Sequence, residues 1–450
     1  MLLPPRLLCS TLLLSSLSLG AATPSSSTAQ PSAALNPSIE RDYQQHLGAL
    51  FDYFHRNPEL SGMEVNTAAR IAKELKAAGY TVTEHVGGTG VVALLKNGDG
   101  PTVLLRADMD GLPVEEKSGL ANASKVQMKD PAGNLVHVMH ACGHDVHITS
   151  LVGTARYMAS HKEQWRGTLM LVGQPAEETV GGAQGMVKDR LFARFGKPDY
   201  AIALHVASDI ETGKVWIEEG ATHSGVDSVD ILVHGVGAHG ASPHRGKDPV
   251  VIGAQIVLAL QTIVSREVAP REPAVITVGS FHSGTKHNII SDEARLQLTV
   301  RSENPQTREL LLDAIKRVAI NTARAAGVAE SMLPEVIVAD EATPPVVNDI
   351  PLAKRLKAAV QQQMPANTVF DYRRLAMGSE DFGFFTMDPY IPSVYFKVGG
   401  TPAADFAKEK QGGPAVPSHH SPLFKISAEP SVRTGVEASV VMLLDLMPVK

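Results

Sequence analysis

The chain has 450 residues, of which 44% are hydrophobic and 20% charged, and it carries a formal net charge of −6 at pH 7 with histidine neutral. This length allows one large domain or two ordinary ones, and the composition is typical of a globular protein. The mild acidity and the lack of a Lys/Arg run argue against nucleic acid as a partner.

Residues 1–22 have the pattern of a secretory signal peptide. Arg6 supplies a positive charge, Leu7 to Leu19 is largely apolar, and small residues at 20–22 suit cleavage. Residues 23–37 are rich in Ser, Thr, Ala and Pro, carry no charge and predict a flexible tether. We therefore expect an exported protein, periplasmic or secreted, and the stretches after the leader predict no membrane span.

Strands and helices alternate after the tether, which predicts an α/β sheet. Helical spacing covers 41–54, 66–78 and 149–160, and strand patterns cover 81–85, 91–95, 102–106, 168–172 and 200–206. Between 226 and 341 the order becomes βαββαβ, the pattern of a ferredoxin-like α+β module. A helix at 352–363 and a strand at 393–398 resume the first style. We expect a catalytic domain over 38–225 and 342–450, interrupted by the module at 226–341.

The segment His140-Ala141-Cys142-Gly143-His144-Asp145-Val146-His147 holds the one cysteine that follows the leader. A lone thiol cannot form an internal disulfide, and exported proteins rarely keep reactive thiols without a use. A thiolate among imidazoles suits a borderline divalent metal such as zinc. The segment therefore predicts a metal site, with the choice among its histidines left open by spacing alone.

Other candidate ligands follow predicted strands, whose carboxyl ends meet at one edge of an open α/β sheet. They are Cys142 and His144 after the strand-like 135–139, Asp108 and Asp110 after 102–106, Glu177 and Glu178 after 168–172, and His205 in 200–206. Neighbouring side chains of an extended segment point to opposite sides. One carboxylate of the glutamate pair is thus expected to bind metal and the other to serve as general base.

These segments together resemble the aminoacylase/carboxypeptidase G-like family of dinuclear metallopeptidases. Within it they are most similar to hippurate hydrolases, N-acyl amino acid amidohydrolases and auxin-conjugate (IAA-amino acid) hydrolases. The resemblance covers residue 40 to the end and rests on the segments at 55–61, 106–113, 139–145, 174–178, 238–244, 378–382 and 420–422. The Cys-Gly-His-Asp and Pro-Ala-Glu-Glu elements in this order are the most specific.

The resemblance implies a fold, a site and an activity. It implies a mixed-sheet catalytic domain and makes the inserted module a lid and dimerisation domain of a homodimer or larger homo-oligomer. It implies two divalent metals per subunit, zinc or manganese with cobalt or nickel as alternatives. Their ligands would be Cys142, His144, Glu178, His205 and His420, the last chosen over His419 because it directly precedes Ser-Pro.

Further roles are assigned to residues around these ligands. By resemblance, Glu177 is the general base, His239 polarises the scissile carbonyl and Asn288 contacts substrate. Asp110 and Asp145 are expected to accept the second N–H of ligating imidazoles, and His140 and His147 are weaker candidates for the same task. Glu380 is compatible with either a place in the substrate pocket or a salt bridge.

The expected activity is metal-dependent hydrolysis of the linear amide bond of an N-acyl or N-aroyl amino acid, giving a carboxylic acid and an amino acid. One alternative is an exported metallo-dipeptidase or aminopeptidase that acts on a free amino terminus. The other is a metal- or ligand-binding protein without catalysis, which the presence of Glu177 disfavours because this residue binds no metal in the proposed scheme.

Overall fold

A computed structural model describes residues 35–339, 342–372, 374 and 376–449. The predicted signal peptide and residues 23–34 of the predicted tether lie outside them. Residues 35–37, expected in the tether, instead form the first turn of α1 (Leu35–Asp42), because Leu35 and Ile39 are buried. A π-helical turn at Tyr43–Leu47 joins α1 to α2 (Gly48–Arg56), and α3 (Val65–Ala77) follows.

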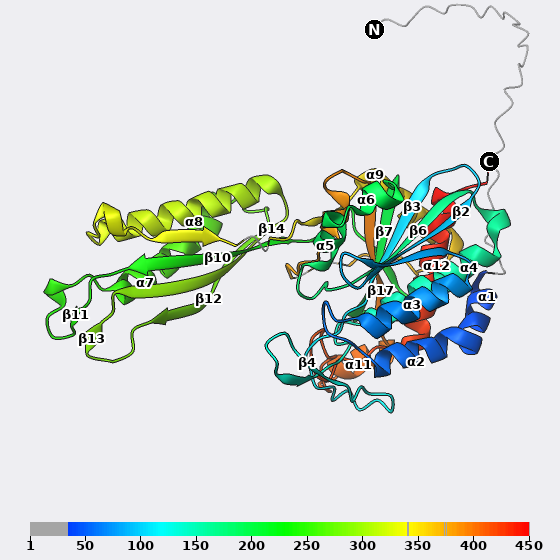
Figure 1. Ribbon diagram of the computed structural model, residues 1–450, viewed down its shortest axis with the longest axis horizontal. Helices are drawn as coiled ribbons and strands as arrows, with labels where there is room; N and C mark the ends of the chain where they lie inside the picture. The colour runs from blue at the N-terminus through cyan, green and yellow to red at the C-terminus, as the bar shows by residue number, and fades with distance from the viewer. Residues whose placement is uncertain (1–34, 340–341, 373, 375, 450) are drawn as a thin grey trace, which may run out of the picture. The chain divides into compact units, whose positions relative to one another are not determined.

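A seven-stranded mixed sheet forms the centre of the larger domain (Figure 1). Its spatial order is β1-β2-β6-β3-β7-β17-β8, in which β6, β3, β7 and β17 run parallel to one another. The remaining strands pair antiparallel at the two sides. The strands are β1 (Thr81–Val86), β2 (Gly90–Asn97), β3 (Thr102–Asp108), β6 (Gly167–Gln174), β7 (Tyr200–Glu211), β8 (Val215–Ile217) and β17 (Ser393–Thr401).

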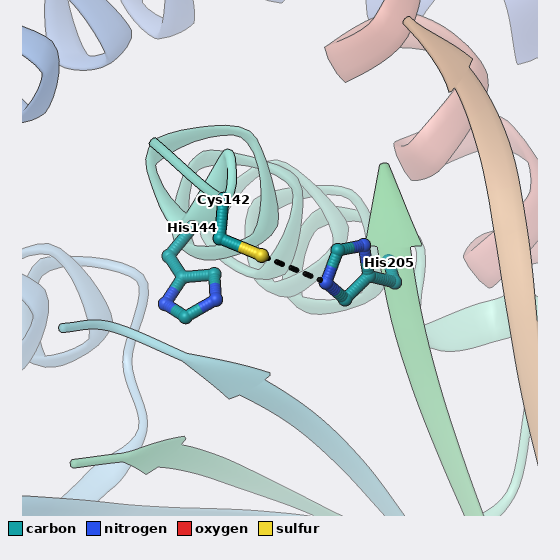
Figure 2. Close-up of side chains that lie close together, drawn as sticks. All are labelled: Cys142, His144 and His205. Atoms are coloured by element: carbon teal, nitrogen blue, oxygen red, sulfur yellow. Dashed lines mark hydrogen bonds between the residues drawn. The ribbon is translucent and has the colours of Figure 1, made fainter. Parts of the chain in front are cut away.

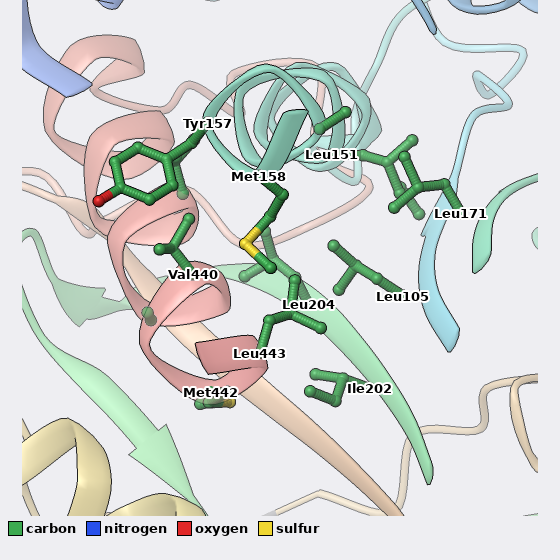
Figure 3. Close-up of a cluster of buried hydrophobic side chains, with 14 of the residues drawn as sticks. Leu105, Leu151, Tyr157, Met158, Leu171, Ile202, Leu204, Val440, Met442 and Leu443 are labelled. Atoms are coloured by element: carbon green, nitrogen blue, oxygen red, sulfur yellow. The ribbon is translucent and has the colours of Figure 1, made fainter. Parts of the chain in front are cut away.

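Helices bury both faces of this sheet, which explains the continuous apolar runs of its strands. On one face, α4 (His144–Ser160) and α12 (Ala428–Leu446) pack side by side over strands β3, β6 and β7. Figure 3 shows Met158 of α4 and Leu443 of α12 near Leu204 of β7, in the core cluster that also includes Leu151 and Ile202. The opposite face packs against α5 (Gly182–Lys188), α6 (Leu191–Phe195) and α10 (Gly383–Thr386).

The second sheet has the order β12-β14-β10-β15, and all of its pairs are antiparallel. Along the chain its elements run β10 (Gly225–His234), α7 (Pro249–Thr262), β12 (Ala274–Ser283), β14 (Glu293–Ser302), α8 (Pro305–Ala325) and β15 (Glu335–Val338). This is the predicted βαββαβ order, so the predicted fold class is confirmed. The exact domain boundaries stay predictions.

Side-chain caps fix where the helices of this module begin. The Asp248 carboxylate accepts the Val250 N–H at 2.9 Å, and the Asn304 side chain accepts the Thr307 N–H at 2.8 Å. Each cap is followed by proline, which needs no N–H partner at that position. In the larger domain, the Asp349 side chain caps α9 (Ile350–Gln363) by accepting the Leu352 N–H at 2.9 Å, and Pro351 is the second residue of this helix.

Short elements complete the described chain. Three two-stranded sheets pair β4 (Gln127–Lys129) with β5 (Leu135–His137), β9 (Gly220–His223) with β16 (Val346–Asn348), and β11 (Ala238–His239) with β13 (Ile289–Ile290). The other short helices are 162–164, 243–245, 263–267, 330–332 and α11 (Ala403–Lys410). The strand predicted at 135–139 thus ends at His137 and belongs to a hairpin, not to the central sheet.

One helical stretch of the described residues, Pro249–Glu267, is long and apolar enough to cross a membrane by length and composition alone. The sequence does not predict it as a span. Its residues Ile252, Ile256 and Leu260 pack into the core of the second sheet, as in the core helix of a globular domain.

Candidate metal centre and active site

The candidate ligands come from strand ends and from the start of one helix. His205 lies in β7, and Glu177 and Glu178 follow β6. Cys142 and His144 do not follow a strand of the central sheet as expected; they lie at the start of α4, which begins at His144 instead of Thr149. Gly143 has φ of 86°, a left-handed conformation that glycine adopts without strain and that lets the chain turn into this helix.

Cys142, His144 and His205 offer ligand atoms that all lie within 4.8 Å of one another (Figure 2). The Cys142 Sγ lies 3.5 Å from Nε2 of His205. Two ligands at about 2.3 Å and 2.0 Å from a tetrahedral zinc are separated by about 3.5 Å, so this pair has the spacing of zinc ligands. His205 Nδ1 donates to the carbonyl of Val206 at 2.6 Å, which leaves Nε2 as the lone-pair nitrogen.

Glu178 and His420 complete the set on the other side of Cys142. The three residues offer ligand atoms within 4.8 Å of one another, and His420 Nε2 lies 3.4 Å from Glu178 Oε2. The His420 N–H donates to the carbonyl of Ala141 at 2.9 Å, which ties its loop to the Cys142 segment. The structure therefore brings all five predicted ligands together in overlapping groups.

His419 takes a different position from its neighbour. Its Nε2 accepts the Ser208 N–H at 3.2 Å, and its Nδ1 lies 3.6 Å from Cys142 Sγ. With Nε2 occupied as an acceptor, the neutral ring carries its proton on Nδ1, facing the sulfur. Among the groups that could hold a metal, only His420 of the two appears within the described residues.

Unsatisfied buried atoms indicate that a divalent cation fits this donor set. His144 Nε2 and Glu178 Oε1 are buried and have no hydrogen-bond partner in the described part of the chain, although they are only 3.9 Å apart. Buried polar atoms are normally paired, and a shared cation would satisfy both. Thiolate, imidazole and carboxylate donors together suit zinc, while the oxygen donors also suit manganese.

Asp110 lies beside two of the candidate ligands, and His147 contacts the strand that carries a third. Asp110 Oδ1 lies 3.2 Å from His144 Nδ1, while its Oδ2 accepts the Glu178 N–H at 3.0 Å. His147 Nε2 accepts the Val206 N–H at 2.8 Å, and its Nδ1 contacts Asp108. The Asp110 carboxylate thus lies against the ring of a candidate ligand. The Asp108 carboxylate contacts His147, whose ring in turn contacts the strand that carries His205.

Asp145 contacts no predicted ligand imidazole, contrary to expectation. Its carboxylate lies 2.7 Å from His55 Nδ1, and Glu116 lies 3.3 Å from the other nitrogen of that ring. Burial alone lowers the pKa of His55, but the two carboxylates outweigh it and raise the pKa to about 10. His140 is buried with neither ring nitrogen hydrogen-bonded among the described residues, so it does not orient a ligand through a hydrogen bond; its ring centre lies 6.5 Å from that of His144.

Glu177 and Glu178 lie in a turn, so the expectation of an extended segment with alternating side chains is wrong. Both carboxylates reach within 4.8 Å of His144, and beyond it they diverge. Glu178 approaches Cys142, whereas Glu177 groups with Glu380 and Asp381. The pair thus still separates a ligand position from a second position in the same cavity.

The environment of Glu177 favours its protonated form in the absence of cations. Burial first, and then the neighbouring carboxylates of Glu380 and Glu178, raise the pKa of Glu177 well above its ordinary value. Divalent cations in the same cavity act in the opposite direction. Glu177 is therefore set between opposing influences, as a group that takes up and returns a proton must be.

Glu380 belongs to a buried ion-pair network, the salt-bridge option that the sequence left open. Its carboxylate accepts one hydrogen bond from Arg106 Nη2 at 2.7 Å and another from the Tyr395 hydroxyl at 2.8 Å. Arg106 is fully buried and also donates to Asp108 at 2.6 Å and Asp381 at 3.3 Å. Sequence reasoning did not single out Arg106, although an arginine inside the apolar run of β3 is an unusual residue that marks a buried partner.

A cavity of about 660 Å³ opens onto this centre. Its lining includes Cys142, Glu177, Glu178, His205, Glu380 and His420. His239 and Asn288 are not among the lining residues. They lie at the β11–β13 pair of the second sheet, where the Gly240 N–H donates to the Asn288 carbonyl at 2.9 Å and the His239 ring is exposed. Their predicted roles stay predictions.

Residues 104–411 match the family model for peptidase family M20/M25/M40. The chain belongs to this family. The predicted resemblance to the dinuclear metallopeptidases is confirmed, and this M20-family member is a metal-dependent amidohydrolase.

The M20-family chain is similar over most of its length to several named relatives. It is 38% identical to a hippurate hydrolase of Campylobacter jejuni over 76% of this chain and 86% of that protein. It is 32% identical to an IAA-amino acid hydrolase of Arabidopsis thaliana, over 83% of this chain and 79% of that protein. Among solved structures it resembles a dinuclear metal-binding M20 peptidase of Bacillus subtilis, with a TM-score of 0.74 and 25% identity over 90% and 99%.

A second solved structure supports the same fold. An aminohydrolase from methicillin-resistant Staphylococcus aureus superimposes with a TM-score of 0.80 at 30% identity, covering 92% of this chain and 99% of that one.

Proposed function

We propose that this protein cleaves the amide bond of N-acyl or N-aroyl amino acids, giving a carboxylic acid and a free amino acid. The observation that carries the proposal is the position of Glu177, which lies within 4.8 Å of His144 and Glu178 and lines the cavity next to the candidate ligands. The names of similar proteins, a hippurate hydrolase, an N-acetyl-L-cysteine deacetylase and an IAA-amino acid hydrolase, support this substrate class.

Two divalent ions per subunit are proposed as cofactors, zinc or manganese, with cobalt or nickel as alternatives. Cys142, His144, Glu178, His205 and His420 would hold them. When bound, such ions lower the pKa of water and polarise a carbonyl oxygen. Asp110 keeps His144 oriented through the contact of 3.2 Å between Oδ1 and Nδ1.

Two residues of the chain are proposed to transfer the proton and to stabilise the developing charge. Glu177 accepts a proton from the attacking water and returns it to the leaving amine, because it groups with His144 and Glu178 but is not itself assigned as a ligand. His239 is proposed to stabilise the negative charge on the former carbonyl oxygen. Since His239 does not line the cavity, this role requires the second sheet of the same subunit, or that of a partner subunit, to bring the ring there during turnover.

Metal analysis combined with a substrate panel tests the proposal. The panel pairs acetyl-, benzoyl- and indoleacetyl-amino acids with unblocked dipeptides. We expect two metal equivalents per chain and hydrolysis of at least one acylated compound. Hydrolysis of the unblocked dipeptides alone would favour the dipeptidase alternative, and a metal-loaded protein inert toward the entire panel would favour a binding protein.

Location and assembly are also proposals. The apolar leader at 1–22 supports export to the periplasm or the medium. The family resemblance supports a homodimer or larger homo-oligomer formed through the second sheet. N-terminal sequencing of the exported protein and light scattering test the two statements.

A further inference from the structure

Two cationic side chains in the cavity at the candidate metal centre form no ion pair among the described residues, although five carboxylates, those of Glu177, Glu178, Asp209, Glu380 and Glu409, also line it. Three cationic side chains line it, Arg301, Arg374 and Lys397. Arg374 forms an ion pair with Glu303. Neither Arg301 nor Lys397 forms an ion pair with any carboxylate of residues 35–339, 342–372, 374 and 376–449. A cation removed from bulk water without a counter-ion is costly, so these two positions need an explanation.

Lys397 lies directly beside the candidate ligands. It sits on β17, where its Cα pairs in register with His205 of β7 on one side and with Trp216 of β8 on the other. Its Nζ lies 5.5 Å from the centre of the Trp216 ring, a cation–π contact that compensates only part of a charge. The strand pairing fixes this cation one strand away from a metal ligand.

The carboxylate with the strongest influence on Lys397 is already occupied. Asp209 also lines the cavity, and its carboxylate accepts the Tyr372 hydroxyl. Burial lowers the pKa of Lys397, and Asp209 only partly opposes this. The amine thus has an environment in which a further anion would be bound favourably.

Arg301 supplies the second unmatched charge, from a different element. It lies on β14 of the second sheet, and its Nη1 donates to the Met377 carbonyl at 2.7 Å. A carbonyl satisfies one N–H but leaves the charge of the guanidinium uncompensated. Arg301 and Lys397 come from different sheets and both line the cavity, so each offers a position for an anion.

We infer that the substrate carries two carboxylates and that Lys397 binds the second of them. An N-acyl amino acid with neutral substituents brings one carboxylate, which leaves one of the two cations unmatched. A dicarboxylic N-acyl amino acid satisfies both. Bound divalent ions add positive charge to the same cavity and make an anionic substrate more favourable. This inference rests on the proposed amide hydrolysis and narrows its substrate class.

Two sources supply a second carboxylate, the side chain of the amino-acid half or the acyl half. Substrate pairs that differ only in this group distinguish them. For one acyl group, N-acyl-glutamate is compared with N-acyl-glutamine; for one amino acid, its N-succinyl derivative is compared with its N-butanoyl derivative. We expect kcat/KM to be about tenfold or more higher for the diacid in one of the two pairs, since a site built for a polar group rejects the analogue that lacks it.

The variant K397M tests the residue. It should bring the ratio within the preferred pair close to one. K397R should recover part of the preference, and K73M, which removes an exposed lysine of α3, should leave the ratio unchanged. The ratio of kcat/KM between the diacid and its analogue is measured on wild type alone. The inference therefore stays testable even if K397M folds poorly.

The outcomes separate the inference from the proposed function. Hydrolysis of N-acyl amino acids without a diacid preference in either pair overturns the inference alone, as does a preference that survives in K397M. If no acylated compound is hydrolysed, the proposed function fails. Titration calorimetry of the metal-loaded protein with the diacids N-butanoyl-glutamate and N-succinyl-glutamine and with the monoacid N-butanoyl-glutamine then still decides the inference. Tighter binding of one diacid that K397M abolishes supports it, and equal binding of all three compounds overturns it.

Discussion

Replacing Arg106 by methionine should destabilise the larger domain far more than removing an ordinary surface ion pair. The guanidinium is fully buried and donates to Gln174 at 2.7 Å, to Asp108 at 2.6 Å and to Glu380 at 2.7 Å. Methionine fills a similar volume but donates no hydrogen bond. The variant therefore leaves three carboxylates, those of Asp108, Glu380 and Asp381, without their shared cation.

The expected loss can be bounded from such buried pairs. Removing one partner of a buried ion pair costs about 3–5 kcal/mol, because the other charge stays buried and unpaired. Here several carboxylates are affected, so we expect the free energy of unfolding to fall by at least about 3 kcal/mol at pH 7. The matched control R156M removes a partly exposed pair with Asp42 and should cost about 1 kcal/mol or less.

The dependence on pH gives the sign of the effect. Burial raises the pKa of Asp108, but Arg106 and the neighbouring histidines outweigh it and hold the pKa well below its usual value. A carboxyl whose pKa is depressed by folding stabilises the protein above its unfolded pKa of about 3.9 and loses that contribution as the pH falls. The difference between wild type and R106M should therefore be constant down to about pH 4 and shrink as the pH falls further.

Urea unfolding followed by tryptophan fluorescence measures this difference. Both tryptophans of the chain report on the larger domain, since Trp165 is buried in its core and Trp216 lies on β8. A loss below about 1 kcal/mol at pH 7, similar to that of R156M, would refute the claim that Arg106 neutralises the buried carboxylates. A loss that does not vary with pH would refute the electrostatic cause.

Three further predictions concern single residues. H239A should reduce kcat by about 10²–10³ with unchanged metal content; an increase in KM alone contradicts the oxyanion role. H55Q should destabilise the protein by about 3 kcal/mol near pH 6. Because the folded pKa of about 10 lies above the unfolded value of about 6.5, that loss should vanish as the pH rises through 10, and a constant difference in urea unfolding speaks against the ion pair. Mild peroxide should inactivate the apo protein irreversibly through Cys142 while the metal-loaded form resists; equal sensitivity means the thiol is no ligand.

Local patterns predict the elements whose polarity repeats. The helix expected at 66–78 is α3 at Val65–Ala77, and the alternating residues Val229, Ile231 and Val233 form the buried face of β10. Such segments have one apolar and one polar face, so their period is visible in the sequence. The start of α4 is not visible in this way, because nearly all of this helix is buried and its first turn carries polar site residues.

The candidate ligands could be predicted from strand ends and from the segments that resemble the family. The buried ion pairs around the site could not be predicted in this way. Glu380 lies 274 positions from Arg106 along the chain, and no local pattern pairs residues so far apart. His55 and Asp145 are likewise brought together by packing of α2 against α4. The extended segment predicted at Glu177-Glu178 is a turn in the structure, because strand β6 already ends at Gln174.

The most direct test of the proposed chemistry compares wild type with E177Q, measuring metal content and product release from hippurate and an N-acyl-glutamate on the same samples. We expect two metal equivalents in both proteins, release of the carboxylic acid and the amino acid by wild type, and no turnover by E177Q. Loss of metal in E177Q would mean that the roles of Glu177 and Glu178 are exchanged. Undiminished hydrolysis by E177Q would contradict the assignment of Glu177 as the general base.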